Sequence, residues 1–343
     1  FKLERFDFLR ATTGNMFRPA DVMVGADGAI YVADWFDPGV GGHNDRDKSC
    51  SGTIYRVAPK GFVPTVPEIK RPLTTGGALT LLSSPAINVR YAGYQALRKA
   101  GAAALPAVRS LLEHPNRYLR GRAIYLLPYL GAEWLDMAAE YLTDEDPVTR
   151  LVAFRALRSA GGDPLTLIRP LLEDPDPHLR RELAIALRDL DPFRKGTYVA
   201  SLLSRYDGDR TYLEACGLAA EKTEDRVWSQ LRVLANANDP LLWTPQFAEV
   251  TWRLKAPMAI SALKTRAESA ELREADRLFA IESLAFIDTP TAVLALLEIA
   301  RTPGPVGASA TRWLIHLGST RWAQFDVLDK LKEQGIYDPA KVK

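Results

Sequence analysis

Residues 35–51 hold the densest cluster of side chains capable of chemistry. Asp37, Asp45 and Asp47 supply carboxylates within a short stretch that is also rich in glycine. Carboxylate oxygens are the ligands that hard cations such as Ca²⁺ prefer, so these three residues are candidate metal ligands. His43 adds an imidazole that exchanges protons near neutral pH, and with Asp45 it is a candidate for acid–base catalysis. The sequence therefore offers this segment as a site for a metal ion or for proton transfer.

A simpler interpretation of residues 35–51 is structural. Asp and Asn side chains commonly accept hydrogen bonds from nearby backbone N–H groups in turns, and such bonds alone explain their presence in a loop. The spacing matches neither a calcium-binding EF-hand loop nor the H-E-x-x-H zinc motif, and it contains no nucleophile elbow. Both interpretations of the segment stay open.

Charge and cysteine content argue against several classes of partner. The chain has 44 basic and 42 acidic residues, a net charge of +2. Binding to nucleic acid or to an anionic membrane usually requires a much stronger positive field. Cys50 and Cys216 form no C-x-x-C or C-x-x-C-H run for zinc or covalent haem. No apolar stretch approaches the roughly 18 residues of a membrane span. We therefore expect neither a nucleic-acid partner nor membrane insertion by this chain.

Predicted β-strands flank the candidate site. Residues 21–24 and 29–35 alternate with a period close to two, and Asp27-Gly28 between them is typical of a hairpin turn. A third strand is predicted over residues 52–57. Three short strands cannot cover their own apolar faces, so residues 1–62 must pack on the following helices or on a larger β domain.

A helical repeat is predicted over residues 75–343, after a proline-rich connector over residues 63–74. Four columns of residues recur at a spacing of 30: Arg90, Arg120, Arg150, Arg180 and Arg210; Leu97, Leu127, Leu157 and Leu187; Leu112, Leu142, Leu172 and Leu202; Gly101, Gly131 and Gly161. One unit reads as a helix over 148–160, a glycine turn, and a second helix over 164–173. Asp-Pro pairs at Asp146 and Asp176 predict an N-cap followed by a first-turn proline.

This repetition predicts a mainly α fold. A single helical hairpin cannot bury its own apolar stripe, whereas stacked hairpins share a continuous core that the leucine columns would form. We expect a right-handed α-solenoid of about eight HEAT-like helical hairpins, preceded by a small antiparallel β segment. Such a stack is a scaffold or interaction surface rather than a catalytic body.

The arginine column has two interpretations. An Asp stands four positions before Arg150 and before Arg180, a spacing that lets acidic and basic residues of adjacent repeats pair along the stack. Such a structural ladder would fix the register of the repeats, because exposed ion pairs contribute only about 0–1 kcal/mol each. Alternatively, the arginines form a basic stripe that binds an acidic partner.

The strand region carries a family resemblance. Residues 17–35 read FRPADVMVGADGAIYVADW, followed by GGH at residues 41–43 and GTIYR at residues 52–56. This pattern resembles the last blade of the β-propeller in the large membrane-bound-dehydrogenase-like proteins of planctomycetes and verrucomicrobia. In those proteins the propeller, similar to that of quinoprotein sugar dehydrogenases, is followed by HEAT-type repeats and a c-type cytochrome domain. In this chain, too, the blade-like segment precedes the helical repeat.

The resemblance implies a periplasmic or secreted redox protein that oxidises sugars or alcohols and passes electrons to haem. It implies haem c, and PQQ or Ca²⁺, as cofactors of a parent protein, with the rest of the propeller and a cytochrome as adjacent domains. It also places His43, Asp45 and Arg46 near the propeller pocket. Since this chain lacks most of a propeller and any haem-attachment motif, it would serve as a scaffold and not be catalytic by itself.

Two other functions stay open. The chain can be a stand-alone HEAT-repeat module that binds a protein partner. It can also be a metal-dependent hydrolase or a carbohydrate-binding protein that uses the Asp-rich loop.

Overall fold

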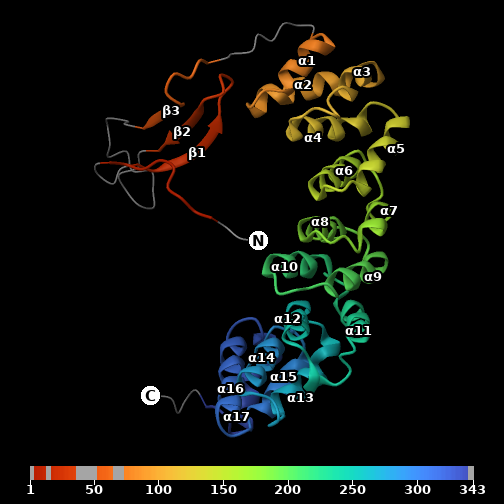
Figure 1. Cartoon of the computed structure of the whole chain (residues 1–343). Helices are drawn as coiled ribbons and strands as arrows, with labels where there is room; N and C mark the ends of the chain where they lie inside the picture. The colour runs from red at the N-terminus through yellow and green to blue at the C-terminus, as the bar shows by residue number, and fades with distance from the viewer. Residues whose placement is uncertain (1–3, 13–16, 36–51, 65–72, 339–343) are drawn as a thin grey trace. The chain divides into compact units, whose positions relative to one another are not determined.

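The structure is a computed structural model that describes residues 4–12, 17–35, 52–64 and 73–338. The chain divides into two compact units, Lys2–Gly162 and Asp163–Lys343, which we call the N-terminal unit and the C-terminal unit (Figure 1). The last strand ends at Val57 and the first helix begins at Thr75. The predicted domain boundaries at residues 62 and 74 lie between these two points and stay a prediction.

The N-terminal unit begins with a three-stranded antiparallel sheet in the order β1-β2-β3. Its strands are β1 (Pro19–Val24), β2 (Ile30–Asp34) and β3 (Thr53–Val57). Gly28 has a φ of +86° between β1 and β2, which confirms the predicted Asp-Gly turn. Val32 of β2 lies between Val22 of β1 and Tyr55 of β3.

The sheet is only partly covered. Val24 packs against a small cluster on the first helices formed by Leu81, Ala86 and Val89. By contrast, Val22 is 64% exposed and Ile54 is 72% exposed. The first helices therefore bury part of the apolar surface of the sheet, and much of the rest is exposed to solvent.

Helices joined by turns and short loops follow the sheet. Those of the N-terminal unit are α1 (Thr75–Leu82), α2 (Ile87–Ala100), α3 (Leu105–Arg109), α4 (Arg117–Leu126), α5 (Glu133–Glu140) and α6 (Pro147–Ser159). Those of the C-terminal unit are α7 (Pro164–Ile168), α8 (Pro177–Leu187), α9 (Pro192–Leu203), α10 (Arg210–Ala219), α11 (Glu224–Leu234), α12 (Pro245–Leu254), α13 (Ile260–Glu268), α14 (Glu274–Ala285), α15 (Pro290–Ile299), α16 (Pro305–Gly318) and α17 (Val327–Glu333). The chain is thus mainly helical, as the sequence predicts.

The predicted capping residues lie at the ends of these helices. The Asp146 carboxylate accepts hydrogen bonds from Val148 N and Thr149 N at the start of α6. The Asp176 carboxylate accepts one from Leu179 N at the start of α8. Gly161, after α6, has a φ of +95°, a conformation that favours glycine.

Some predicted second helices are shorter than expected. The helix predicted over 164–173 is α7, which ends at Ile168 and continues as a 3₁₀ turn over Arg169–Leu171. Pro170 lies inside this turn and has no N–H to donate, so the α-helical bonding cannot continue there. Further 3₁₀ turns are Gly101–Ala104, Leu127–Tyr129, Tyr141–Thr143, Pro240–Leu242, Pro257–Ala259 and Ala323–Phe325.

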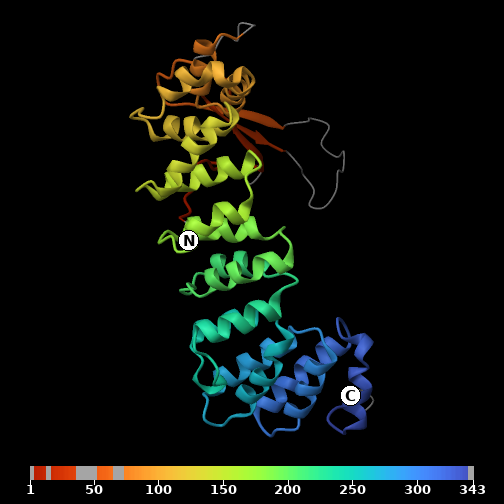
Figure 2. The ribbon, with the colours of Figure 1, turned by 90° about the vertical axis from the view of Figure 1, so that its right-hand side faces the viewer.

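The hairpins stack in two layers within each unit. In the C-terminal unit, first helices contact one another in the order α8, α10, α12, α14 and α16, and second helices pair as α9 with α11 and α13 with α15. Figures 1 and 2 show the same stacking of successive hairpins within the units. The first leucine column lies in the core, with Leu97, Leu127 and Leu187 fully buried. None of the helices in the described residues has the length and apolar composition that crossing a membrane requires.

Candidate functional site

The candidate residues of the Asp-rich loop lie outside the described part of the chain. Asp37, His43, Asp45, Arg46 and Asp47 all fall within residues 36–51. Their roles in metal binding or proton transfer therefore stay predictions. Among the described residues, no group of three or more His, Cys, Asp or Glu side chains is arranged to hold a metal ion.

Asp34, the last described acidic residue before this loop, has a structural role in the sheet. Its Oδ1 accepts a hydrogen bond from Arg18 N at 2.7 Å, and its Oδ2 accepts one from the Tyr55 hydroxyl at 3.4 Å. The carboxylate thus joins the chain before β1 to strand β3.

Four of the five arginines in the column stabilise the loop that directly precedes their own helix. The Nη1 atom of each arginine donates to one or two backbone carbonyls five or six residues earlier: Arg90 to Pro85, Arg120 to His114 and Pro115, Arg150 to Asp144 and Glu145, and Arg180 to Asp174 and Pro175. A guanidinium suits this role because its several donors reach neighbouring carbonyls at once. This role was missed at the sequence level, although for each of the four the fixed distance of four residues from the N-cap position to the arginine is its signal. The ion-pair ladder between adjacent repeats stays a prediction.

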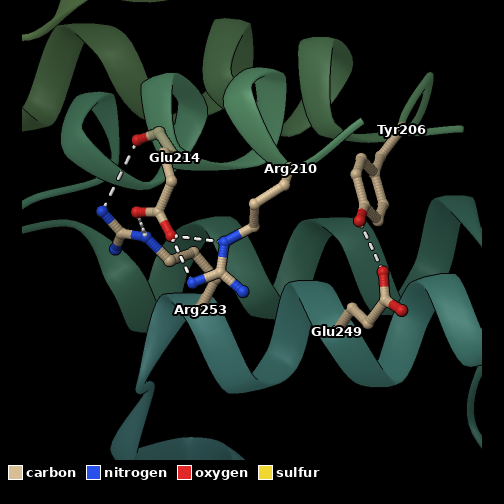
Figure 3. Close-up of polar contacts among 5 residues, drawn as sticks. All are labelled: Tyr206, Arg210, Glu214, Glu249 and Arg253. Carbon is tan, nitrogen blue, oxygen red and sulfur yellow. Dashed lines mark hydrogen bonds and ion pairs between the residues drawn. The ribbon is translucent and has the colours of Figure 1, made fainter. Parts of the chain in front are cut away.

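Arg210 departs from this pattern. Its Nε donates to Glu214 Oε1 at 2.8 Å, and Arg253 Nε from α12 donates to Glu214 Oε2 at 2.6 Å (Figure 3). Burial raises the pKa of Glu214, but the bonds from Arg253 and Arg210 outweigh it and hold that pKa below its ordinary value. One carboxylate therefore ties α10 to α12 at this point.

A second polar contact lies beside this cluster. The Tyr206 hydroxyl, from the loop before α10, donates to Glu249 Oε2 of α12 at 2.5 Å (Figure 3). Burial and the bond to the Glu249 carboxylate both raise the pKa of Tyr206. Tyr206 therefore keeps its proton and acts as a fixed donor to Glu249.

These residues border a hollow of about 580 Å³ on the face formed by α10, α12 and α14. Its aromatic and charged lining residues are Tyr206, Trp243, Trp252, Phe279, Arg210, Arg266, Arg273, Glu249, Asp276 and Glu282. Three positive and three negative side chains thus surround an aromatic interior. The hollow lies wholly within the C-terminal unit.

Stacked cations hold the aromatic walls of the hollow. The Arg210 guanidinium carbon lies 4.5 Å from the centre of the Trp252 ring, and that of Arg266 lies 5.1 Å from the Trp243 ring. Trp243 also donates its Nε1–H to Ala237 O at 3.0 Å. Arg266 is only 4% exposed, and burial lowers its pKa. Such contacts fix ring orientation, so the hollow is preformed.

The charges around the hollow differ in how they are neutralised. Arg273 pairs with Asp276 at 2.8 Å, and Arg210 pairs with Glu214. Glu249 accepts from a neutral hydroxyl, and Glu282 has no ion pair within the described residues. Arg266 donates to the backbone carbonyl of Pro240 and is buried, so Glu249 and Glu282 are the more accessible charged groups that a ligand would meet. The sequence signal for this site is the loss of the regular spacing after Arg210 together with the aromatic residues at positions 243 and 252.

Comparison with known proteins identifies the repeat type. A family model described as HEAT repeats matches residues 105–188. The chain is similar to the crystal structure of an engineered protein, with 15% identity over 78% of this chain and 85% of that chain, at a TM-score of 0.34. It is also similar to the complex of CpcE and CpcF of phycocyanin lyase from Nostoc sp. PCC7120, with 19% identity over 78% of this chain and 100% of that chain, at a TM-score of 0.22.

No curated protein sequence matches the chain. The match to HEAT repeats over residues 105–188 agrees with a mainly helical fold of HEAT-like hairpins.

Proposed function

We propose that this chain is a protein-binding scaffold and that the hollow over α10, α12 and α14 receives an anchoring side chain of a protein partner. The observation that supports this is the preformed aromatic interior bordered by the carboxylates of Glu249 and Glu282. HEAT-like stacks expose long, regular surfaces, and binding to other proteins is the use that such surfaces suit best.

The lining predicts the chemistry of the anchor. Trp252, Leu272 and Phe279, each half-buried, offer apolar surface that a buried aliphatic or aromatic side chain would cover. Arg210 and Arg273 are already paired with acidic residues of this chain. The partner segment should therefore carry an apolar residue next to a lysine or an arginine that meets Glu249 and Glu282.

Binding to an array of peptides that place leucine or phenylalanine beside lysine or arginine tests this proposal. The full chain should bind members of the array, and Glu282→Lys should weaken that binding by about tenfold, the effect of about 1.4 kcal/mol. Glu333→Lys in α17 is the matched control, because Glu333 is exposed and lies outside the hollow. Failure of every peptide to bind, or equal binding by Glu282→Lys, would refute this function.

A second proposal concerns a parent protein. The exposed apolar side chains of the sheet, Val22 and Ile54 among them, are surface that a neighbouring propeller blade would cover. This supports the hypothesis that the helical repeats hold a propeller and a c-type cytochrome in fixed relation within a periplasmic or secreted redox protein. Haem c, and PQQ or Ca²⁺, would then belong to the other domains.

The mass and the visible spectrum of the natural protein test this second proposal. A mass well above 38.0 kDa together with a haem Soret band is the expected result. A mass near 38.0 kDa without a chromophore would refute it and leave the scaffold function unaffected.

A further inference from the structure

A groove of about 450 Å³ crosses α2, α4 and α6 in the N-terminal unit. Arg90, Arg117, Arg120 and Arg122 line it, and Asp146 is the one acidic residue among the lining residues that the structure describes. We call this surface the basic groove. It lies in a different compact unit from the aromatic hollow and has the opposite balance of charge.

The four arginines of the basic groove are not neutralised by ion pairs. Among the described residues, none of them has a carboxylate within ion-pair distance, unlike Arg210 in the C-terminal unit. Their hydrogen bonds go to neutral acceptors: Arg90 to Pro85 O at 2.6 Å, Arg120 to His114 O at 2.8 Å and Pro115 O at 3.1 Å, Arg122 to Leu82 O at 2.5 Å, and Arg117 to the Tyr118 hydroxyl at 3.2 Å.

Asp146 offsets only part of this charge, through its electrostatic attraction to Arg117. Its carboxylate accepts hydrogen bonds from Val148 N and Thr149 N at 3.2 Å and from the Thr149 hydroxyl at 2.9 Å. It is therefore committed to capping α6. Each arginine keeps unused N–H donors, since a guanidinium has five.

Like charges crowd within the groove. Burial lowers the pKa of Arg122, and the nearby positive charge of Arg90 lowers it further. Two guanidinium groups that repel each other, neither in an ion pair with a described carboxylate, form a region where a bound anion is stabilised.

Apolar surface beside the arginines indicates which class of ligand fits the basic groove. Tyr118 is 63% exposed and Val148 is 53% exposed, and Val152 and Tyr125 complete this part of the lining. A small inorganic anion would leave that surface in contact with water. The net charge of +2 for the whole chain gives no strong field for nucleic acid. A peptide with acidic and aliphatic side chains would contact both the arginines and the apolar side chains of the groove.

We propose that the basic groove binds an acidic segment of a protein partner. Carboxylates of that segment meet the guanidinium groups of Arg117 and Arg122, and an aliphatic side chain packs on Val148 and Val152. This inference does not depend on the aromatic hollow.

Fluorescence anisotropy with the full chain tests the proposal. The probes are labelled peptides in which glutamates flank leucine at varied spacings, and matched peptides in which glutamine replaces every glutamate. The glutamate peptides should bind and the glutamine peptides should bind at least about tenfold more weakly. Arg117→Gln should weaken binding about fivefold, and Arg117→Glu more than about tenfold. Arg117 suits mutation because its side chain is exposed and, among the described residues, hydrogen-bonds its neighbour Tyr118 rather than a loop carbonyl.

Arg109→Glu is the matched control, because Arg109 is an exposed arginine of α3 outside the groove. It should leave the affinity unchanged, as should Glu282→Lys in the hollow. The proposal fails if no glutamate peptide binds, if Arg117→Glu binds like the parent, or if Arg109→Glu weakens binding equally. It also fails if inorganic phosphate or a single-stranded RNA binds this groove more tightly than the peptides do.

Discussion

Replacement of Gly93 by alanine should destabilise the N-terminal unit, although alanine is the better helix former. Gly93 lies in α2, where its Cα faces the backbone of α1. A Cβ added there would lie 2.5 Å from Ala78 O and 2.6 Å from Leu82 N, whereas ordinary contact begins at 3.4 Å. Both clashing atoms are backbone, so no side-chain rotation relieves the overlap, and α1 must move away from α2.

Two opposing effects determine how much Gly93→Ala lowers the free energy of unfolding. Glycine to alanine in a helix interior stabilises by about 1 kcal/mol. Overpacking of a tight contact costs about 1–3 kcal/mol, and a clash with backbone belongs at the upper end of that range. We therefore expect a net loss of about 2 kcal/mol, which for a unit of this size lowers Tm by about 4–8 °C.

Thermal unfolding of the full chain, followed by circular dichroism, measures this effect. Gly121→Ala in α4 is the control, because a Cβ there meets only the Val152 methyl groups at 3.9 and 4.0 Å. That variant should gain up to about 1 kcal/mol. If Gly93→Ala unfolds at the same temperature as the parent or above it, the close approach of α1 and α2 is wrong.

The remaining predictions concern two ionisable groups of the C-terminal unit. The pKa of Glu214 lies below its ordinary value of 4.5, because the bonds from Arg253 and Arg210 outweigh its burial. Its contribution to stability is therefore present above about pH 4.5 and is lost as the pH falls through the folded pKa. Glu214→Gln should cost about 0–1 kcal/mol at about pH 7. Its urea midpoint should approach that of the parent near pH 3, and an equal difference at both pH values would contradict the ion pair. Burial raises the pKa of the Cys216 thiol to about 12. Cys216 should therefore resist iodoacetamide at about pH 8 until the protein is unfolded, and peptide mass spectrometry of the native protein would reveal any early alkylation.

Local signals in the sequence were enough to predict the helical hairpins. Caps, first-turn prolines and turn glycines act within a few residues, so Asp146 and Gly161 have the predicted roles. The helix predicted over 164–173 is wrong beyond Ile168, because leucine periodicity continues past Pro170 although proline has no N–H to donate.

The spatial arrangement decided what the charged side chains do. Arg180 and Arg210 occupy equivalent positions in the column, yet Arg180 bonds loop carbonyls while Arg210 shares Glu214 with Arg253. Arg210 has a carboxylate four residues on in its own helix, whereas Ala184 occupies that place after Arg180. That Arg253 of the next helix shares this carboxylate depends on packing, and a spacing of 30 carries no information about it.

The sequence by itself determined the repeat, the hairpins and the three strands, because each depends on periodicity and on neighbouring residues. Only the tertiary structure decided the two surfaces that we propose for binding. Tyr206 meets Glu249, and Arg90 lies near Arg122, because stacking brings successive hairpins within a few ångströms of one another. The neutralisation of a charge depends on those distances between helices, so the basic groove and the aromatic hollow become visible only once the hairpins are packed.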